Sequence, residues 1–159
     1  MNYICELQGT GCAIAFTLNH VSKNYLDVIV EFVVDPVIQQ ITIRSVTNYI
    51  TVSELRGLLT YFDEHLRNIE EDSYVFMPQE VGFQLQAQMG ERDEDGTGYI
   101  SVLILLNIGF NTNGDRIYSG GKITVSLTEL QLFLQELQTA FDAIRYAQAN
   151  MPDPDKAEM

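Results

Sequence analysis

Residues 50–69 read ITVSELRGLLTYFDEHLRNI, and they contain the clearest change from a strand pattern to a helix pattern in the chain. The first four letters of this stretch recur at the start of ITVSLTELQLFLQELQTAFDAI, residues 123–144. In both places a β-branched run gives way to apolar residues at i, i+3, i+4, i+7, i+11 and i+14, the spacing of an amphipathic helix. The sequence therefore predicts two helices, each entered from a strand. Their apolar positions are Leu55, Leu58, Leu59, Phe62, Leu66 and Ile69, then Leu130, Phe133, Leu134, Leu137, Phe141 and Ile144.

The two apolar stripes match at an offset of 75 residues, whereas the two ITVS copies match at 73. Ser53, or Thr51 with Glu54 three residues later, is the expected N-cap of the first helix. Thr128 lies opposite Ser53 as the alternative cap of the second helix. An internal repeat and convergence on one strand-to-helix junction explain this match equally well.

Period-two alternation predicts strands in the remainder of the chain. Ile41 and Ile43 are expected to point inward from the fourth strand. Asn113-Gly114 predicts a two-residue hairpin turn, and Gly120-Gly121 predicts a bulge or a close backbone approach. The expected strands are residues 3–8, 12–19, 25–34, 38–47, 81–89, 99–108 and 115–125.

The predicted fold class is α+β: antiparallel meanders with two amphipathic helices packed on the sheet, in the order of two tandem meander–helix units. We expect one domain over residues 1–149, with sub-units 1–72 and 73–149 as the alternative division, and a disordered tail over residues 150–159. Residues 99–108 are apolar on both faces, which predicts a central strand covered on both sides.

The chain is strongly acidic, with a net charge of −13 that both halves share. Residues 1–72 carry four Lys/Arg against ten Asp/Glu, and residues 73–159 carry five against twelve. Nucleic acid is a poor partner for such a surface, since phosphate binding needs basic residues. A basic protein is the partner that this charge favours, with simple solubility as the alternative explanation.

The N-terminal residues MNYICELQGTG lack a basic region followed by a long apolar core, so we expect a cytoplasmic protein with no membrane partner. Cys5 and Cys12 fit a reducing compartment as buried free thiols. If residues 9–11 form a tight turn, Cys5 faces Ile14 across the hairpin and Leu7 faces Cys12.

No local motif indicates catalysis, a metal or a cofactor, so we expect a non-enzyme without cofactors. The segment ERDEDGTGY resembles a calcium loop in its first positions, but position 12 is Val102 and no helices flank it. His20 and His65 have no further ligand at metal-binding spacing. A catalytic triad assembled in space stays open as an alternative.

The element order resembles that of small immunity-type domains of bacterial contact-dependent toxin systems, in particular the WapI immunity family. The similarity covers about residues 45–145, through ITVSELRGLLTYFDEHL, QEVGFQLQAQM, the acidic hairpin, GGKITVS and TELQLFLQELQTAFDAI. Glu80 matches the acidic residue that precedes a strand in that family. The resemblance implies a non-enzymatic inhibitor that binds a toxin, often a nuclease domain with a basic active site.

Two acidic clusters are the partner-binding candidates by charge density. The alternatives to a protein-binding module are a structural homodimer, in which a second copy covers one face of residues 99–108, and a small-ligand-binding protein. The candidate contact residues are Glu91, Asp93, Glu94 and Asp95 on the hairpin, and Glu70, Glu71 and Asp72 after the first helix.

Overall fold

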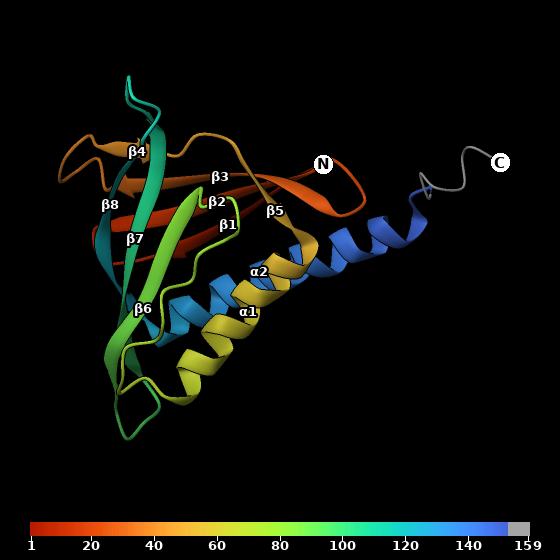
Figure 1. Cartoon of the computed structure of the whole chain (residues 1–159). Helices are drawn as coiled ribbons and strands as arrows, with labels where there is room; N and C mark the ends of the chain where they lie inside the picture. Colours follow the sequence, from red (N-terminus) through yellow and green to blue (C-terminus); the bar gives the residue numbers. More distant parts are fainter. Residues whose placement is uncertain (153–159) are drawn as a thin grey trace.

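The first half of the chain forms a five-stranded antiparallel sheet in the computed structural model, which describes residues 1–152 (Figure 1). The long strands β1, β2 and β3 pair in sequence order, and the short strands β4 and β5 share the remaining edge of β3. The bounds are β1 (Asn2–Gln8), β2 (Cys12–His20), β3 (Tyr25–Val34), β4 (Thr42–Arg44) and β5 (Asn48–Thr51).

The second half forms a three-stranded antiparallel meander, and one helix follows each sheet. This order confirms the predicted α+β class with two successive meander–helix units. The bounds are α1 (Val52–Arg67), β6 (Phe83–Arg92), β7 (Gly98–Phe110), β8 (Arg116–Ser126) and α2 (Leu127–Asn150).

Both helices are capped by a Thr or Ser side chain that lies three residues before a glutamate. Thr51 Oγ1 accepts the N–H of Glu54 at 3.0 Å, and the Glu54 carboxylate accepts the N–H of Thr51 at 3.3 Å, which makes a capping box. Ser126 Oγ accepts the N–H of Glu129 at 3.1 Å. Cap and glutamate are offset by 75 residues, as the apolar stripes are. The offset of 73 residues between the ITVS copies is therefore two residues shorter than the offset between the equivalent positions of the two helices. The cap of the second helix is Ser126 and not Thr128.

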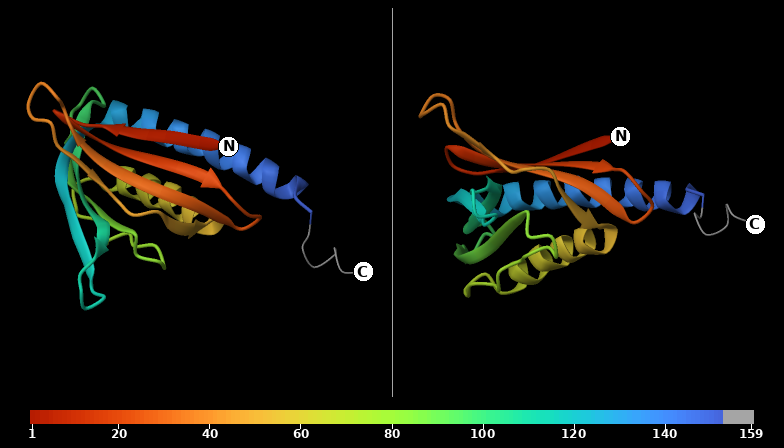
Figure 2. Two further views of the ribbon diagram at one scale, coloured as in Figure 1. Left: turned by 90° about the horizontal axis from the view of Figure 1, so that it is seen from above. Right: turned by 45° about the horizontal axis from the view of Figure 1, so that its top comes forward.

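The strands of the second sheet run across those of the first, and the helices lie side by side on the inner side of both (Figures 1 and 2). Four phenylalanines join these layers. The ring of Phe16 on β2 lies 5.6 Å from that of Phe83 on β6 and 5.7 Å from that of Phe133 on α2. Phe62 on α1 lies 5.9 Å from Phe133. The helices thus pack on each other as well as on the sheets, around one core.

The predicted fourth strand, residues 38–47, is largely wrong. Only β4 is extended in the ladder, and Ile41 is exposed instead of facing inward. The strand stops at Ser45, whose N–H still donates to the carbonyl of Val30 at 2.8 Å. The N–H of Val30 is accepted by Ser45 Oγ at 2.9 Å, in place of a backbone carbonyl. The chain then leaves the sheet edge and rejoins it as β5.

The β1–β2 hairpin pairs two residues away from the predicted register. Cys5 lies opposite Phe16 and Leu7 lies opposite Ile14. Cys12 pairs with Val34 on β3 instead of with β1. Both cysteines are free, Cys5 buried and Cys12 partly buried.

The turn between β7 and β8 is longer than the predicted two-residue hairpin. Asn111 and Asp115 close a five-residue loop, and only Gly114 has a positive φ, 83°. The β7–β8 register shifts between Asn107 and Gly109 and not at the double glycine. Gly121 instead marks a close approach, because a Cβ there would lie 2.6 Å from the ring of Phe32.

The outer face of β7 differs from the prediction that this strand is covered on both sides. The inner face is buried, but the described residues cover the outer face only in part: Leu103 is half-buried and Leu105 is 37% exposed. The predicted cover on both sides is therefore wrong for the described part of the single chain.

Helix α2 continues to Asn150, the first residue of the predicted disordered tail. Residues 153–159 of that tail lie outside the described part of the chain.

Candidate functional site

The two acidic clusters predicted to bind a partner come together at one end of the molecule. The turn after α1 packs against the end of β6, where Gly90 N–H donates to the carbonyl of Ile69 at 2.7 Å. Arg92 donates to the carbonyl of Leu66 at 2.8 Å and ties the same two segments. All seven carboxylates of the two clusters are exposed. The structure thus unites the clusters, and their binding role stays a prediction.

Several of these carboxylates have local structural bonds. Asp72 accepts the N–H of Met89 at 2.7 Å and holds the turn on β6. Asp95 accepts the N–H of Thr97 at 3.0 Å and its hydroxyl at 2.6 Å, and these bonds lower the pKa of the Asp95 carboxyl. Asp93 accepts the same hydroxyl at 3.2 Å. Glu71 accepts the side-chain amide of Asn68 at 3.4 Å. Four of the seven predicted contact residues therefore already have bonds within or next to their own turns.

Glu80, which the family resemblance singles out, is also tied to the fold. Its carboxylate accepts the N–H of Tyr49 on β5 at 2.9 Å. The next residue, Val81, has a φ of 51°, a conformation that a β-branched residue rarely adopts. The Val81 carbonyl accepts the hydroxyl of Tyr118 at 3.1 Å, which helps to hold this turn.

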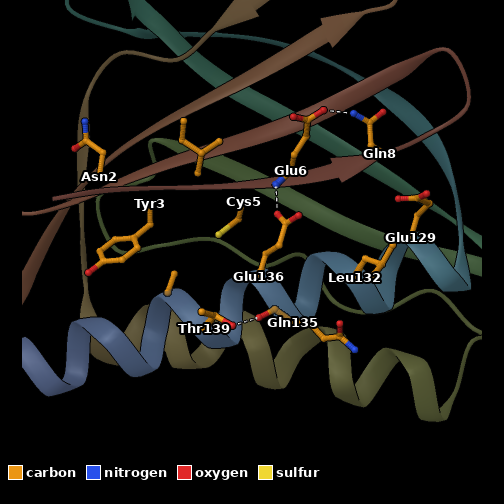
Figure 3. A pocket seen from close by; sticks show the side chains of 12 residues that line it. Asn2, Tyr3, Cys5, Glu6, Gln8, Glu129, Leu132, Gln135, Glu136 and Thr139 are labelled. Atoms are coloured by element: carbon orange, nitrogen blue, oxygen red, sulfur yellow. Dashed lines mark hydrogen bonds between the residues drawn. The ribbon is translucent and has the colours of Figure 1, made fainter.

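A groove of about 770 Å³ lies between the edge strand β1 and helix α2 (Figure 3). We call it the β1–α2 groove. Residues of β1 form one wall and one face of α2 forms the other. The lining residues are Asn2, Tyr3, Ile4, Cys5, Glu6, Gln8, Glu129, Leu132, Gln135, Glu136, Thr139 and Ala140.

The groove exists because β1 has a strand on one side only. Its partner β2 takes every second backbone N–H and C=O, and α2 passes along the other side of β1 without replacing a strand. Across the gap, the N–H of Glu6 donates to the carboxylate of Glu136 at 2.9 Å (Figure 3). An unpaired strand edge is a template for another extended chain.

Every charged residue among the described residues that line the groove is a glutamate. Glu6, Glu129 and Glu136 line it, and none of the described residues that line it is Lys or Arg. The thiol of Cys5 points from β1 toward α2 (Figure 3). Burial, and secondarily the charge of Glu136, raises the pKa of this thiol to about 12, so it is protonated at neutral pH and is no nucleophile.

A smaller cavity of about 350 Å³ between the start of α1 and the end of α2 has the opposite charge. Arg56 and Arg145 both lie over the ring of Phe141, with guanidinium carbons 5.5 and 5.8 Å from its centre. These are cation–π contacts, which stabilise the two cations without a carboxylate. The chain therefore separates a basic corner from the acidic groove.

His65 is a structural residue although it lies off the predicted apolar stripe. Its side chain is 1% exposed and bridges α1 to the segment around Ser73. Nε2 lies 3.1 Å from the carbonyl of Gln88 and must donate, so Nδ1, 2.7 Å from the hydroxyl of Ser73, accepts. Burial lowers the pKa of this imidazole, opposed by the Gln88 carbonyl and Asp72.

Within residues 1–152, no three His, Cys, Asp or Glu side chains are placed to hold a metal ion together. Neither helix in the same range combines the length and apolar character that crossing a bilayer requires.

Comparison with known proteins adds little to this geometry. No family model matches the chain. No curated protein matches it either. Among solved structures, the chain is similar to that of the plant transcriptional regulator PBF-2, with 10% identity and a TM-score of 0.49, over 98% of this chain and 90% of the other. A similarity this distant carries no argument about function.

The groove was not predicted from the sequence. Glu129, Leu132, Glu136 and Thr139 do recur at helical spacing beside the buried stripe of α2, which is a weak signal for a second face. That this face lies along a free strand edge depends on the order of strands in the sheet. The pairing of β1 with a single neighbour supplies that order.

Proposed function

We propose that this protein is a non-enzymatic binding module for a basic protein partner, and that the β1–α2 groove is its binding site. The observation that carries the proposal is that a cavity of about 770 Å³ is lined by three glutamates and by no basic residue among those described. Opposite charges across an interface speed encounter and select the partner, more than they set the final affinity.

The net charge of −13 supports the same partner class, because it attracts a basic protein from any direction. Within this class, an immunity-type inhibitor of a bacterial toxin is the finer proposal, which rests on the resemblance to the WapI family. Such an inhibitor needs no chemistry of its own. It acts by binding a basic segment of the toxin, a task that suits an acidic groove between a sheet and a helix.

The proposal is tested by capture of partners from the native cell on immobilised full-length protein. Three forms are compared: wild type, the groove variant Glu129→Gln/Glu136→Gln, and the hairpin variant Glu91→Gln/Glu94→Gln. Each variant removes two charges and keeps the side-chain shape. We expect wild type and the hairpin variant to retain a basic protein that salt releases, and the groove variant to lose it.

Retention by the groove variant together with loss from the hairpin variant would move the site to the predicted acidic hairpin. Failure of all three forms to retain any basic protein would reject the proposed function. Thermal unfolding of the three forms checks that the substitutions leave the fold intact.

A structural homodimer is the second candidate, favoured by the partly covered outer face and exposed end of β7. Leu105, Ile108 and Phe110 are exposed there, and Ile117 on β8 is exposed beside them. Light scattering separates the candidates. A stable dimer that shows no affinity for basic proteins would favour this role over the binding module.

A further inference from the structure

The free edge of β1 offers more than charge. We propose that the partner enters the β1–α2 groove as an extended basic segment that adds a β-strand to β1, and that it displaces the Glu136 carboxylate from the N–H of Glu6. This inference rests on the proposed function and specifies how the groove binds. It commits to a basic segment of a protein partner as the occupant.

The first step is the direction of the backbone groups of β1. The N–H of Glu6 points away from β2, because it donates to Glu136 at 2.9 Å. Backbone groups of alternate residues in a strand point the same way. The N–H and C=O groups of Asn2 and Ile4 therefore also face the groove. The Glu136 carboxylate oxygen that accepts the N–H of Glu6 occupies the position that a backbone carbonyl of an added strand would take.

The second step is the length of edge that is free. The turn that ends β1 docks on β8, where Thr10 N–H donates to the carbonyl of Thr124 at 3.0 Å. A Cβ on Gly9 would lie 2.9 Å from the same carbonyl, so this end has no room for another chain. The usable edge is residues 2–6, which an extended segment of about five residues would cover at roughly 3.3 Å per residue.

The third step is the sequence of the incoming segment. Successive side chains of an added strand point to opposite faces of the sheet. One set would point toward α2, where Glu129 and Glu136 lie. Lys or Arg at every second position would therefore meet both carboxylates, with charge-assisted hydrogen bonds to the displaced Glu136.

The charges also argue against a second copy of this chain as the occupant. Pairing of two β1 edges would bring Glu6, Glu129 and Glu136 of one copy against the same residues of the other. Like charges directly opposed across paired strands are destabilising. A carboxylate that covers an edge N–H is one way in which proteins protect a sheet edge from self-association. Glu136 would thus exclude a copy and admit a basic strand.

The test uses a seven-residue peptide in which lysine alternates with valine, and binding to the full-length protein is followed by backbone amide NMR. Wild type is compared with Ile4→Pro and with the matched control Ile4→Ala. Ile4 is 66% exposed, so the alanine variant keeps both the fold and the outward N–H. Proline removes that N–H, which makes no bond to β2, and proline is tolerated at such edge positions.

We expect the peptide to shift the amide signals of residues 2–6 in wild type and in Ile4→Ala, and to bind Ile4→Pro about tenfold or more weakly. If Ile4→Pro fails to fold, a peptide that is N-methylated at alternate residues replaces it, because methylation removes strand hydrogen bonds and keeps the charge. The two methylation registers are tested separately, and one of them should lose the same tenfold.

Equal binding of wild type and Ile4→Pro, or of the plain and both methylated peptides, would overturn strand addition. Absence of shifts in residues 2–6 at millimolar peptide would overturn it as well. Either result leaves the proposed function standing if the groove variant still loses its basic partner in the capture experiment. Loss of strand addition and loss of the binding function are therefore distinguishable.

Discussion

Tyr61→Phe removes one oxygen atom from the core, and its effect follows from two hydrogen bonds. The Tyr61 hydroxyl donates to the carbonyl of Tyr74 at 2.6 Å and accepts the N–H of Ala87 at 2.8 Å. The side chain is 1% exposed, and Ala87 on β6 is fully buried. The hydroxyl thus joins α1 to two segments that follow it, and phenylalanine keeps the ring contacts while losing both bonds.

The magnitude follows from what is left unpaired. Loss of the bond to Tyr74 costs about 1 kcal/mol, and a buried N–H without an acceptor costs about 1–3 kcal/mol. We expect Tyr61→Phe to lower the free energy of unfolding by about 2–4 kcal/mol. With a urea dependence of roughly 2 kcal/mol per molar, the midpoint of urea unfolding should fall by about 1–2 M.

Urea unfolding followed by circular dichroism measures this change, and hydrogen exchange of the Ala87 amide gives an independent readout, which should accelerate. Tyr146→Phe is the matched control, since Tyr146 is exposed, and it should stay within about 0.5 kcal/mol of wild type. A Tyr61→Phe midpoint that equals that of the control would refute the reasoning, because the Ala87 N–H would then have found another acceptor.

Three further predictions concern pH, thiol reactivity and helix caps. Burial lowers the pKa of His65, so below its ordinary value of 6.5 the unfolded chain binds a proton that the folded chain does not bind, and stability falls as the pH drops through 6.5. The urea midpoint should therefore fall less in His65→Gln than in wild type over the same pH range, and an equal fall would contradict this. Iodoacetamide should alkylate Cys12 well before Cys5, because Cys12 is partly exposed and burial raises the pKa of Cys5 to about 12. Peptide mass spectrometry measures the two rates, and equal rates would mean that β1 opens readily. Thr51→Ala and Ser126→Ala should each lower the free energy of unfolding by about 1 kcal/mol. The larger loss is expected at Thr51, because its hydroxyl both accepts the N–H of Glu54 and donates to the Glu54 carboxylate. Unchanged urea midpoints in both variants would mean that the caps do not contribute to stability.

The helices and the inner faces of the strands could be predicted because their information is local. Leu55 and Leu130 begin stripes at helical spacing, and both residues are completely buried in the structure. Alternation likewise identified β2 and β3. The predictions that failed depend on distant partners. Ile41 has the pattern of an inward strand residue, but it precedes β4 and is 45% exposed. After β4, the Ser45 hydroxyl accepts the N–H of Val30, so the strand also ends early on that side.

The same distinction applies to the candidate site. The acidic clusters were visible as runs of letters, and the structure brings them to one end of the molecule. The β1–α2 groove was not visible, because Glu6 and Glu136 are 130 residues apart in the chain. Nothing in the local sequence of either residue indicates that a carboxylate on a helix meets a free backbone N–H on an edge strand.

The amino-acid sequence alone predicts where the chain is helical, where it is extended, which side of each element is apolar, and that the protein is acidic. These follow from side-chain hydration and backbone sterics within a few residues. Three features depend on the assembled fold: which strand lies at the edge of the sheet, the contact between the two sheets at Gly121 and Phe32, and which carboxylates face a groove. Those outcomes depend on how apolar faces far apart in the chain fill one core together, and close packing settles that choice across the whole molecule.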